Sequence, residues 1–119
     1  MRLSPHFTLA NGAPSGSVAL ALSNVNLSGD NGDGLDATAV AADVVVTLDN
    51  AEAYVNGGDG LFVGGQAAAH ISRSTFNQNG VNGVEDGAMP AGVFTTGDNT
   101  AHANGTHNVL GATTSEAAF

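Results

Sequence analysis

Three aspartates are the residues in this sequence best placed to bind a metal ion. Asp33 and Asp59 occupy equivalent positions in two similar turns, residues 30–35 and 56–61, and Asp30 begins the first of them. If the turns stack, the two carboxylates stand about one strand spacing apart and repel each other unless a cation lies between them. Carboxylate oxygens are ligands that Ca²⁺ prefers. We therefore expect a candidate calcium site at Asp30, Asp33 and Asp59, with solvated turn carboxylates as the alternative.

Histidine and cysteine usage indicates no further metal site or nucleophile. The sequence has no cysteine, so it forms neither a disulfide nor a thiolate site. His102 and His107 flank one corner and His70 lies on an earlier strand, but a zinc site would need another ligand to converge with them. We expect these histidines to be exposed or to lie in turns, and we expect no catalytic residue and no cofactor other than Ca²⁺.

An internal repeat must position these side chains. Four blocks share one turn, anchored at Gly34, Gly60, Gly83 and Asn108. The anchors recur roughly every 25 residues, an interval typical of a solenoid with one coil per repeat. Apolar residues recur with period two at fixed offsets from the anchors, which predicts strands with an inward face. Each coil is predicted as strand, turn, strand, turn, strand, paired in parallel with the next coil.

The inward columns define the predicted core. One group lies sixteen, fourteen and twelve positions before each anchor, a second column lies seven before, and a third lies one after. In the fourth coil the first group falls on Gly92, Phe94 and Thr96. We expect the following side chains from these columns to be buried: Leu20, Leu22, Val44, Val46, Leu48, Ile71, Phe76 and Phe94.

Polar residues recur at one corner of every coil. An Asx residue stands four positions before each anchor, and Gly follows it in three of the four blocks. Asn tolerates the left-handed backbone region and Gly enters it without steric cost, so the pair suits a tight bend. Stacked Asn amides can also bond along the axis as a ladder. The expected structural turn residues are Asn56, Gly57, Gly60, Asn79, Gly80, Gly83, Asn104 and Gly105.

Composition narrows the class of protein. The chain has 119 residues, 17 of them Gly, with 42% hydrophobic but only 11% charged residues, which favours one turn-rich domain with a narrow core. The chain has eleven acidic residues and two arginines, which gives a net charge of -9. No basic patch for nucleic acid or anionic lipid can form from two arginines. No apolar run is long enough for a membrane helix and no signal peptide is visible, so we expect no membrane insertion.

Residues 50–61 (NAEAYVNGGDGL) and 74–84 (STFNQNGVNGV) resemble coils of the right-handed parallel β-helix repeats of pectate-lyase-like proteins. The resemblance covers about residues 17 to 113. It implies an all-β, short single-domain right-handed parallel β-helix, a solenoid of about four coils. Residues 1–16 are then an N-terminal lead-in or cap, residues 17–113 the coils, and residues 114–119 a C-terminal tail.

Catalytic members of this superfamily cut polysaccharides with carboxylates on one strand face, often with Ca²⁺, and with an Arg or Lys base for lyase chemistry. Here the positions equivalent to Asp36 are Phe62, Glu85 and Leu110, so a carboxylate pair must skip a coil. The pair would stand about 9 to 10 Å apart, a spacing that inverting glycosidases use. Arg73 is the single central cation. We therefore expect no enzymatic activity and regard these acids as solvated surface groups.

The function that the sequence favours is structural. A four-coil solenoid has two ends whose strand edges and cut core must be covered by a cap, a neighbour or further coils. We expect a self-associating β-helix module, a subunit or segment of an extracellular filament, spike or adhesin, located at the cell surface or outside the cell. Its partner is a second copy bound through the solenoid ends. The alternatives are a carbohydrate-binding module with Tyr54 and Phe62 as outward aromatics, or a small polysaccharide lyase or hydrolase.

Overall fold

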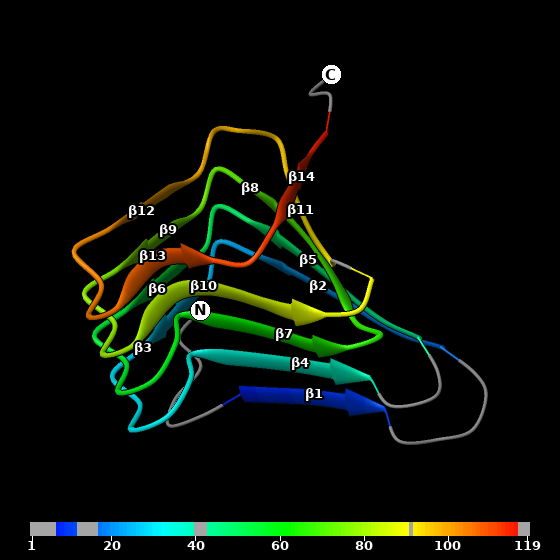
Figure 1. Cartoon of the computed structure of the whole chain (residues 1–119), viewed down its shortest axis with the longest axis horizontal. Coiled ribbons are helices and arrows are strands. Elements are labelled where there is room, and N and C mark those ends of the chain that lie inside the picture. Colours follow the sequence, from blue (N-terminus) through cyan, green and yellow to red (C-terminus); the bar gives the residue numbers. More distant parts are fainter. Residues whose placement is uncertain (1–6, 12–16, 40–42, 91, 117–119) are drawn as a thin grey trace.

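The computed structural model describes residues 7–11, 17–39, 43–90 and 92–116. These residues form 14 β-strands and no helix, and the strands stack as a parallel β-solenoid of about four turns (Figure 1). The all-β solenoid predicted from the repeat is therefore confirmed. No helix in the described ranges has the length and apolar character needed to cross a membrane.

Three parallel sheets form the sides of the solenoid. Sheet I holds β1 (Phe7–Asn11), β4 (Leu35–Ala39), β7 (Leu61–Gly65), β10 (Asn82–Ala88) and β13 (His107–Leu110). Sheet II holds β2 (Ser17–Ser23), β5 (Asp43–Asp49), β8 (Ala68–Ser72), β11 (Val93–Thr95) and β14 (Thr113–Ser115). Sheet III holds β3 (Asn26–Ser28), β6 (Glu52–Tyr54), β9 (Thr75–Asn77) and β12 (Thr100–His102). Each coil runs through sheet II, then III, then I.

Both segments predicted to flank the coils contribute to the sheets. Strand β1, within the predicted lead-in or cap, pairs with β4 from Phe7 opposite Leu35 to Asn11 opposite Ala39. Strand β14 crosses into the predicted tail and pairs with β11. The rest of the predicted lead-in, residues 1–6 and 12–16, and residues 117–119 of the tail lie outside the described residues.

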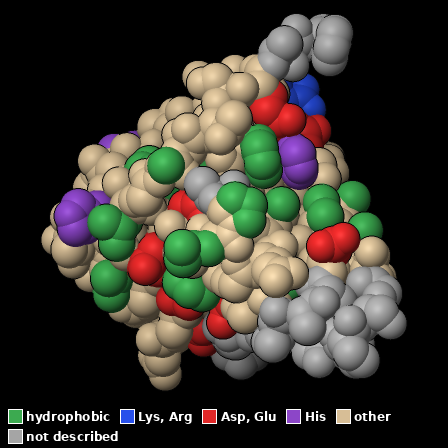
Figure 2. All heavy atoms as spheres, turned by 45° about the vertical axis from the view of Figure 1, so that its right-hand side comes forward, with side chains coloured by type: hydrophobic (Ala, Val, Ile, Leu, Met, Phe, Trp, Pro, Cys, Tyr) green, Lys and Arg blue, Asp and Glu red, His purple; other side chains and the backbone are tan. Residues whose placement is uncertain are grey.

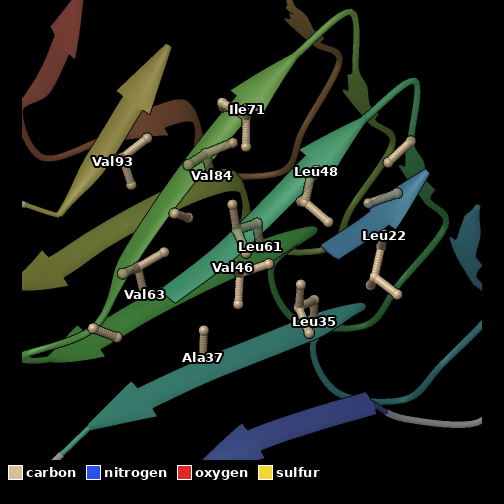
Figure 3. Close-up of a cluster of buried hydrophobic side chains, with 14 of the residues drawn as sticks. Leu22, Leu35, Ala37, Val46, Leu48, Leu61, Val63, Ile71, Val84 and Val93 are labelled. Atoms are coloured by element: carbon tan, nitrogen blue, oxygen red, sulfur yellow. The ribbon is translucent and has the colours of Figure 1, made fainter. Parts of the chain in front are cut away.

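The core lies between the three sheets (Figure 3). It contains most residues of the predicted columns and also Ala37 and Val63, further along β4 and β7, which no predicted column included. In the second coil the three inward side chains of β5 are fully buried, and their neighbours above and below stack in register. Leu20 differs from the prediction because it is only half-buried, on the first strand of sheet II, where no strand of the described residues lies below it. The expected residues that are buried are Leu22, Val44, Val46, Leu48, Ile71 and Phe76.

The predicted register is wrong in the first strand of the fourth coil. Thr95, not Thr96, pairs with Ile71, and Val93 takes the inward place that we expected for Phe94. The next strand returns to the predicted register, with Thr100 opposite Thr75. The corner that follows β11 is therefore one residue longer than the corner that follows β8, which displaces the count from the anchor. Phe94 lies half-buried on the outer face as a result.

Candidate functional site

An asparagine ladder ties the coils together at the corner between sheets III and I. Asn56 Nδ2 donates to Oδ1 of Asn79 at 2.9 Å, and Asn79 Nδ2 donates to Oδ1 of Asn104 at 3.0 Å. Each amide also donates to the carbonyl of the coil before it, as Asn79 does to Ala53 at 3.1 Å. Asn56 and Asn79 are only 2% and 1% exposed, so these two rungs form buried hydrogen bonds, whereas Asn104 is half-buried.

The corner glycines are required by close approach of the coils rather than by the left-handed backbone that we expected. None of Gly57, Gly80 and Gly105 has a positive φ, and neither do the ladder asparagines. In every coil the positive φ belongs to the residue just before the Asp or Asn of the corner: Gly29, Val55, Gln78 and Ala103. A Cβ on Gly80 would lie 2.3 Å from the carbonyl oxygen of Gly57, so any side chain would push the coils apart.

The anchor glycines are also required by close approach, here of the ladder asparagines. A Cβ on Gly60 would lie 2.8 Å from Asn79 Nδ2, and a Cβ on Gly83 would lie 2.6 Å from Asn104 Nδ2. Each glycine thus makes room for the asparagine of the coil above. Asn108 occupies the next place in this column, and its Oδ1 accepts from Asn104 Nδ2 at 3.1 Å. Asn108 therefore fills the position of the next rung and ends the ladder.

The predicted calcium ligands form links within and between turns. Asp33 Oδ1 accepts the backbone N–H of Asp59 at 2.7 Å, and Asp59 Oδ1 accepts the N–H of Asn82 at 2.9 Å. Asp30 Oδ2 accepts the N–H of Gly32 in its own turn at 3.2 Å. In the described part of the chain, no group of three or more His, Asp or Glu side chains is arranged to hold a metal ion. The structure thus does not bring Asp30, Asp33 and Asp59 together as a calcium site.

Asp59 and Glu85 form a carboxyl pair that the sequence analysis missed. Asp59 is only 5% exposed, and this burial, a hydrogen bond with Glu85 and the charge of Asp33 raise its pKa to about 7. Glu85 Oε2 also accepts from Asn82 Nδ2 at 3.0 Å. Two carboxyl groups can hydrogen-bond to each other only when one of them carries a proton. With this raised pKa, Asp59 carries the proton at mildly acidic pH.

His70, His102 and His107 lie apart on different strands. His70, on β8, stacks on Phe94 with ring centroids 4.9 Å apart, and its Nδ1 lies 2.9 Å from Oε1 of Glu116. His107 Nδ1 lies 3.2 Å from Oδ1 of Asn82, and His102 is exposed on β12. The contact with Glu116 was not predicted because that residue follows the last strand, beyond the repeat.

Sheet I carries the outward column that contains Asp36. The pairing places Phe62, Glu85 and Leu110 on the next three strands, as the offsets predict. The Phe62 ring lies over two glycines, because a Cβ on Gly64 would be 2.7 Å from its Cε1 and one on Gly87 would be 3.4 Å from its Cε2.

The central cation is not available to this face. Arg73 lies at the corner between sheets II and III, where Nε donates to Asp49 Oδ1 at 2.9 Å and NH2 contacts the other carboxylate oxygen. This bond lowers the pKa of Asp49 and raises that of Arg73. Acidic side chains occur at several separate places on the surface in Figure 2.

The end of the solenoid formed by β12, β13 and β14 is open in the described part of the chain. A cavity of about 300 Å³ enters the core there. Its floor is apolar, with Ile71, Phe76, Val84 and Val93. Threonine and asparagine side chains, Gly97, Ala101 and Val109 complete the lining, and none of the lining residues carries a charge. This end exposes core that further strands would cover.

The opposite end differs from it. In the first coil the inward residues Leu27 and Leu35 are fully buried. In the fourth coil Ala101, which is equivalent to Leu27, is half-buried, and Val109, equivalent to Leu35, is 45% exposed. Leu110 beside it is 37% exposed. Leu35 is covered by β1 and therefore does not mark an end. On β2, the first strand of sheet II, Val18 and Leu20 are also half-buried, so among the described residues inward side chains are partly uncovered at both ends, with Val109 the most exposed of them. The sequence signal for the exposure in the last coil was the change to small residues there.

A comparison with protein families, with curated proteins and with solved structures found no match to this chain.

Proposed function

We propose that this chain is a structural β-solenoid module that self-associates through its solenoid end. We place it with the right-handed parallel β-helices of the pectate-lyase-like type, as a subunit or segment of an extracellular or cell-surface filament, spike or adhesin. The observation that carries the proposal is the open C-terminal end of the described residues, where a cavity without charged lining residues reaches core side chains and Val109 is exposed. Edge strands with free backbone groups and cut apolar core favour contact with another strand layer.

The chemistry of the remaining surface supports a structural role rather than a catalytic one. Asp36 and Glu85 stand two strands apart on sheet I, with Phe62 between them. Asp36 Oδ1 accepts from the hydroxyl of Thr38 at 2.7 Å, and Glu85 is engaged by Asn82. Arg73, the cation that lyase chemistry would need, is bound to Asp49 at a different corner. These groups are therefore used in intramolecular bonds.

Sedimentation velocity tests self-association directly. The purified chain should form a species larger than its 11.7 kDa monomer as its concentration rises through the micromolar range. Association should strengthen from about 50 mM to about 500 mM salt, because the net charge of -9 repels copies until salt screens it. A compact monomer at every concentration and salt level would overturn the proposal.

A carbohydrate-binding face is the second candidate, and the position of Phe62 favours it. An aromatic ring held flat over Gly64 and Gly87 presents an apolar platform of the kind that packs against a sugar ring, and Asp36 and Glu85 beside it could accept hydrogen bonds from hydroxyl groups. Insoluble cellulose or chitin should then remove the unmodified chain from solution. Phe62→Ala should lose this binding, and Phe94→Ala, which changes a half-buried aromatic of sheet II, should keep it. If both variants bind the polysaccharide equally, the Phe62 face is not a carbohydrate-binding site.

A further inference from the structure

We infer that Asn31 is the site at which the folded chain modifies itself covalently, by deamidation through a cyclic succinimide. The sequence has six Asn–Gly pairs. In such a pair the backbone nitrogen of the glycine can attack the side-chain amide carbon of the asparagine, because glycine has no Cβ to hinder the approach. The glycine of the pair Asn11–Gly12 lies outside the described residues. In the other five pairs, the bonds of the asparagine amide and of the glycine nitrogen decide which pair reacts in the folded protein.

Three of these pairs belong to the asparagine ladder and are held at both reacting groups. In the pair Asn79–Gly80, the amide of Asn79 donates to Asn104 and to the carbonyl of Ala53. The nitrogen of Gly80 donates to the carbonyl oxygen of Asn56 at 2.7 Å. The pairs that begin at Asn56 and Asn104 form the same kinds of bonds. The attack requires both groups to leave these bonds, so a ladder pair reacts only when its corner opens locally.

The pair Asn82–Gly83 is held within strand β10. Asn82 is 1% exposed, its Nδ2 donates to Glu85, and its Oδ1 lies 3.2 Å from Nδ1 of His107. Gly83 is buried in the same strand. This pair therefore also reacts only through local opening.

The pair Asn31–Gly32 differs in each of these respects. It lies in the turn between β3 and β4, and both residues are exposed. No side-chain hydrogen bond joins Asn31 to the described part of the chain. The nitrogen of Gly32 donates to Oδ2 of Asp30 in the same turn, at 3.2 Å, and not to a neighbouring coil. The amide carbon and the nitrogen can therefore approach each other without opening a coil.

Asp30 is placed to accept the proton that must leave the nitrogen. The nitrogen of Gly32 gives its proton to the Asp30 carboxylate and bonds to Cγ of Asn31. The proton then passes to the amide nitrogen, which leaves as ammonia while a succinimide ring remains. A water molecule opens the ring at either carbonyl and gives aspartate or isoaspartate. The carboxylate lies within the distance at which a general base acts.

The isoaspartate product changes a close contact between the first two coils. In this product the main chain runs through the former side chain, and the former backbone carbonyl becomes a free carboxylate. A Cβ on Gly57 would lie 2.2 Å from the Asn31 carbonyl oxygen, and the nitrogen of Gly57 donates to the carbonyl of Asp30 at 2.7 Å. A longer main chain and a new charge therefore enter a contact that has no room for a methyl group. The modification should loosen the first coil at this corner.

Mass spectrometry of the folded chain after incubation at mildly alkaline pH tests the site. Chymotryptic cleavage after Leu27 and Leu35 releases residues 28–35, in which Asn31 is the one asparagine. This peptide should gain the mass of an amide exchanged for a carboxyl group at least about tenfold faster than peptides with ladder asparagines, which react only through opening. In urea, the described pairs should react at similar rates. Equal rates in the folded chain would overturn the assignment, as would a folded chain in which Asn31 does not react.

Two variants test the chemistry of the turn. Asn31→Gln is the matched control, and its turn should stay unmodified. Asp30→Asn introduces the residue type that the other three coils carry at this position, so the fold should be kept, which circular dichroism checks. It should slow the reaction at Asn31 severalfold, because an amide does not take up the proton. Fragment masses locate the change at Asn31, and an unchanged rate would overturn the role of Asp30 as the base.

The melting temperature after incubation tests the effect on the coil. The unmodified chain should lose thermal stability as isoaspartate accumulates, which an isoaspartate-specific methyltransferase label measures, whereas Asn31→Gln should not. Equal melting temperatures of the two proteins after full modification would overturn the loosening of the first coil. These measurements on the monomer do not depend on the self-association proposed above.

Discussion

Asn79 donates from Nδ2 to Oδ1 of Asn104 at 3.0 Å, and this bond joins the third coil to the fourth inside the corner. The same side chain accepts the backbone N–H of Asn56 at 3.2 Å and donates to the carbonyl of Ala53. Asn79 therefore contacts the coils on both sides, as Asn56 also does. Removal of Asn79 leaves several buried polar groups without partners.

We predict that Asn79→Ala lowers the free energy of unfolding by about 2 to 4 kcal/mol, because it breaks several hydrogen bonds and leaves buried donors and acceptors unpaired. Urea denaturation measures the change. Asn77→Ala, at a half-buried outward position on β9, is the control and should cost less than about 1 kcal/mol. Equal effects of the two changes would show that the ladder contributes nothing particular to stability.

Phe76 is the largest fully buried side chain, at 1% exposure. Phe76→Ala should lower the free energy of unfolding by about 3 to 5 kcal/mol, since it leaves a cavity in the core. The comparison is Phe94→Ala, which removes an outward, half-buried ring and should cost much less. A loss below about 1 kcal/mol for Phe76→Ala would contradict the assignment of Phe76 to the core.

The carboxyl pair at Asp59 should make stability depend on pH. In the unfolded chain Asp59 ionises near 3.8, whereas in the folded chain its pKa is raised to about 7 by burial and by Glu85. The folded state thus binds more protons between these values. The contribution of this group is complete below about pH 4 and is lost as pH rises through about 7.

The measurement is the melting temperature from pH 4.5 to pH 8 for the unmodified chain and for Asp59→Asn. The variant keeps an oxygen acceptor for Asn82 and removes the titration, so its melting temperature should fall less over this range. Glu52→Gln, at an exposed position on β6, is the control for the change in net charge. Parallel curves for all three proteins would show that Asp59 does not titrate in this window.

Calcium should have little effect on stability. Asp30, Asp33 and Asp59 use carboxylate oxygens to accept backbone N–H groups and are not arranged as a metal-binding group. A ligand that binds only the folded state must raise its stability. We therefore expect the same melting temperature in millimolar Ca²⁺ and in EDTA. An increase of several degrees that Asp33→Asn abolishes would restore the calcium site.

The sequence predicted the fold well because its strongest signals are local. Period-two apolar columns and a fixed corner were enough to place Leu27, Leu35 and their equivalents in register through all four coils. The first strand of the last coil was misplaced because the anchor spacing gives the total length of a coil and does not show which of its corners is longer. Phe94 was assigned to an inward column because it is a large apolar residue at the counted position.

The contacts of the candidate site depend on side-chain geometry that spacing does not encode. Asp59 and Glu85 lie in successive blocks and belong to different columns, so nothing in the repeat relates them. The corner glycines were predicted at the right positions but for a different reason. The sequence suggested a left-handed backbone, whereas the structure shows that a side chain would collide with the backbone of the neighbouring coil. The sequence predicted that solenoid ends need covering. The exposure of Val109 became apparent only when the burial of equivalent residues was compared between coils.

The asparagine ladder has a further consequence for the way the molecule opens. Each of its rungs bonds only to the coils directly before and after it, so the chain resembles a one-dimensional array with nearest-neighbour coupling. In such an array, opening begins where a unit has one neighbour instead of two. Amide hydrogens of β12 and β13 should therefore exchange with solvent first, and protection should increase coil by coil toward β6. Contact with a second copy at the open end would give the fourth coil its second neighbour and remove this gradient.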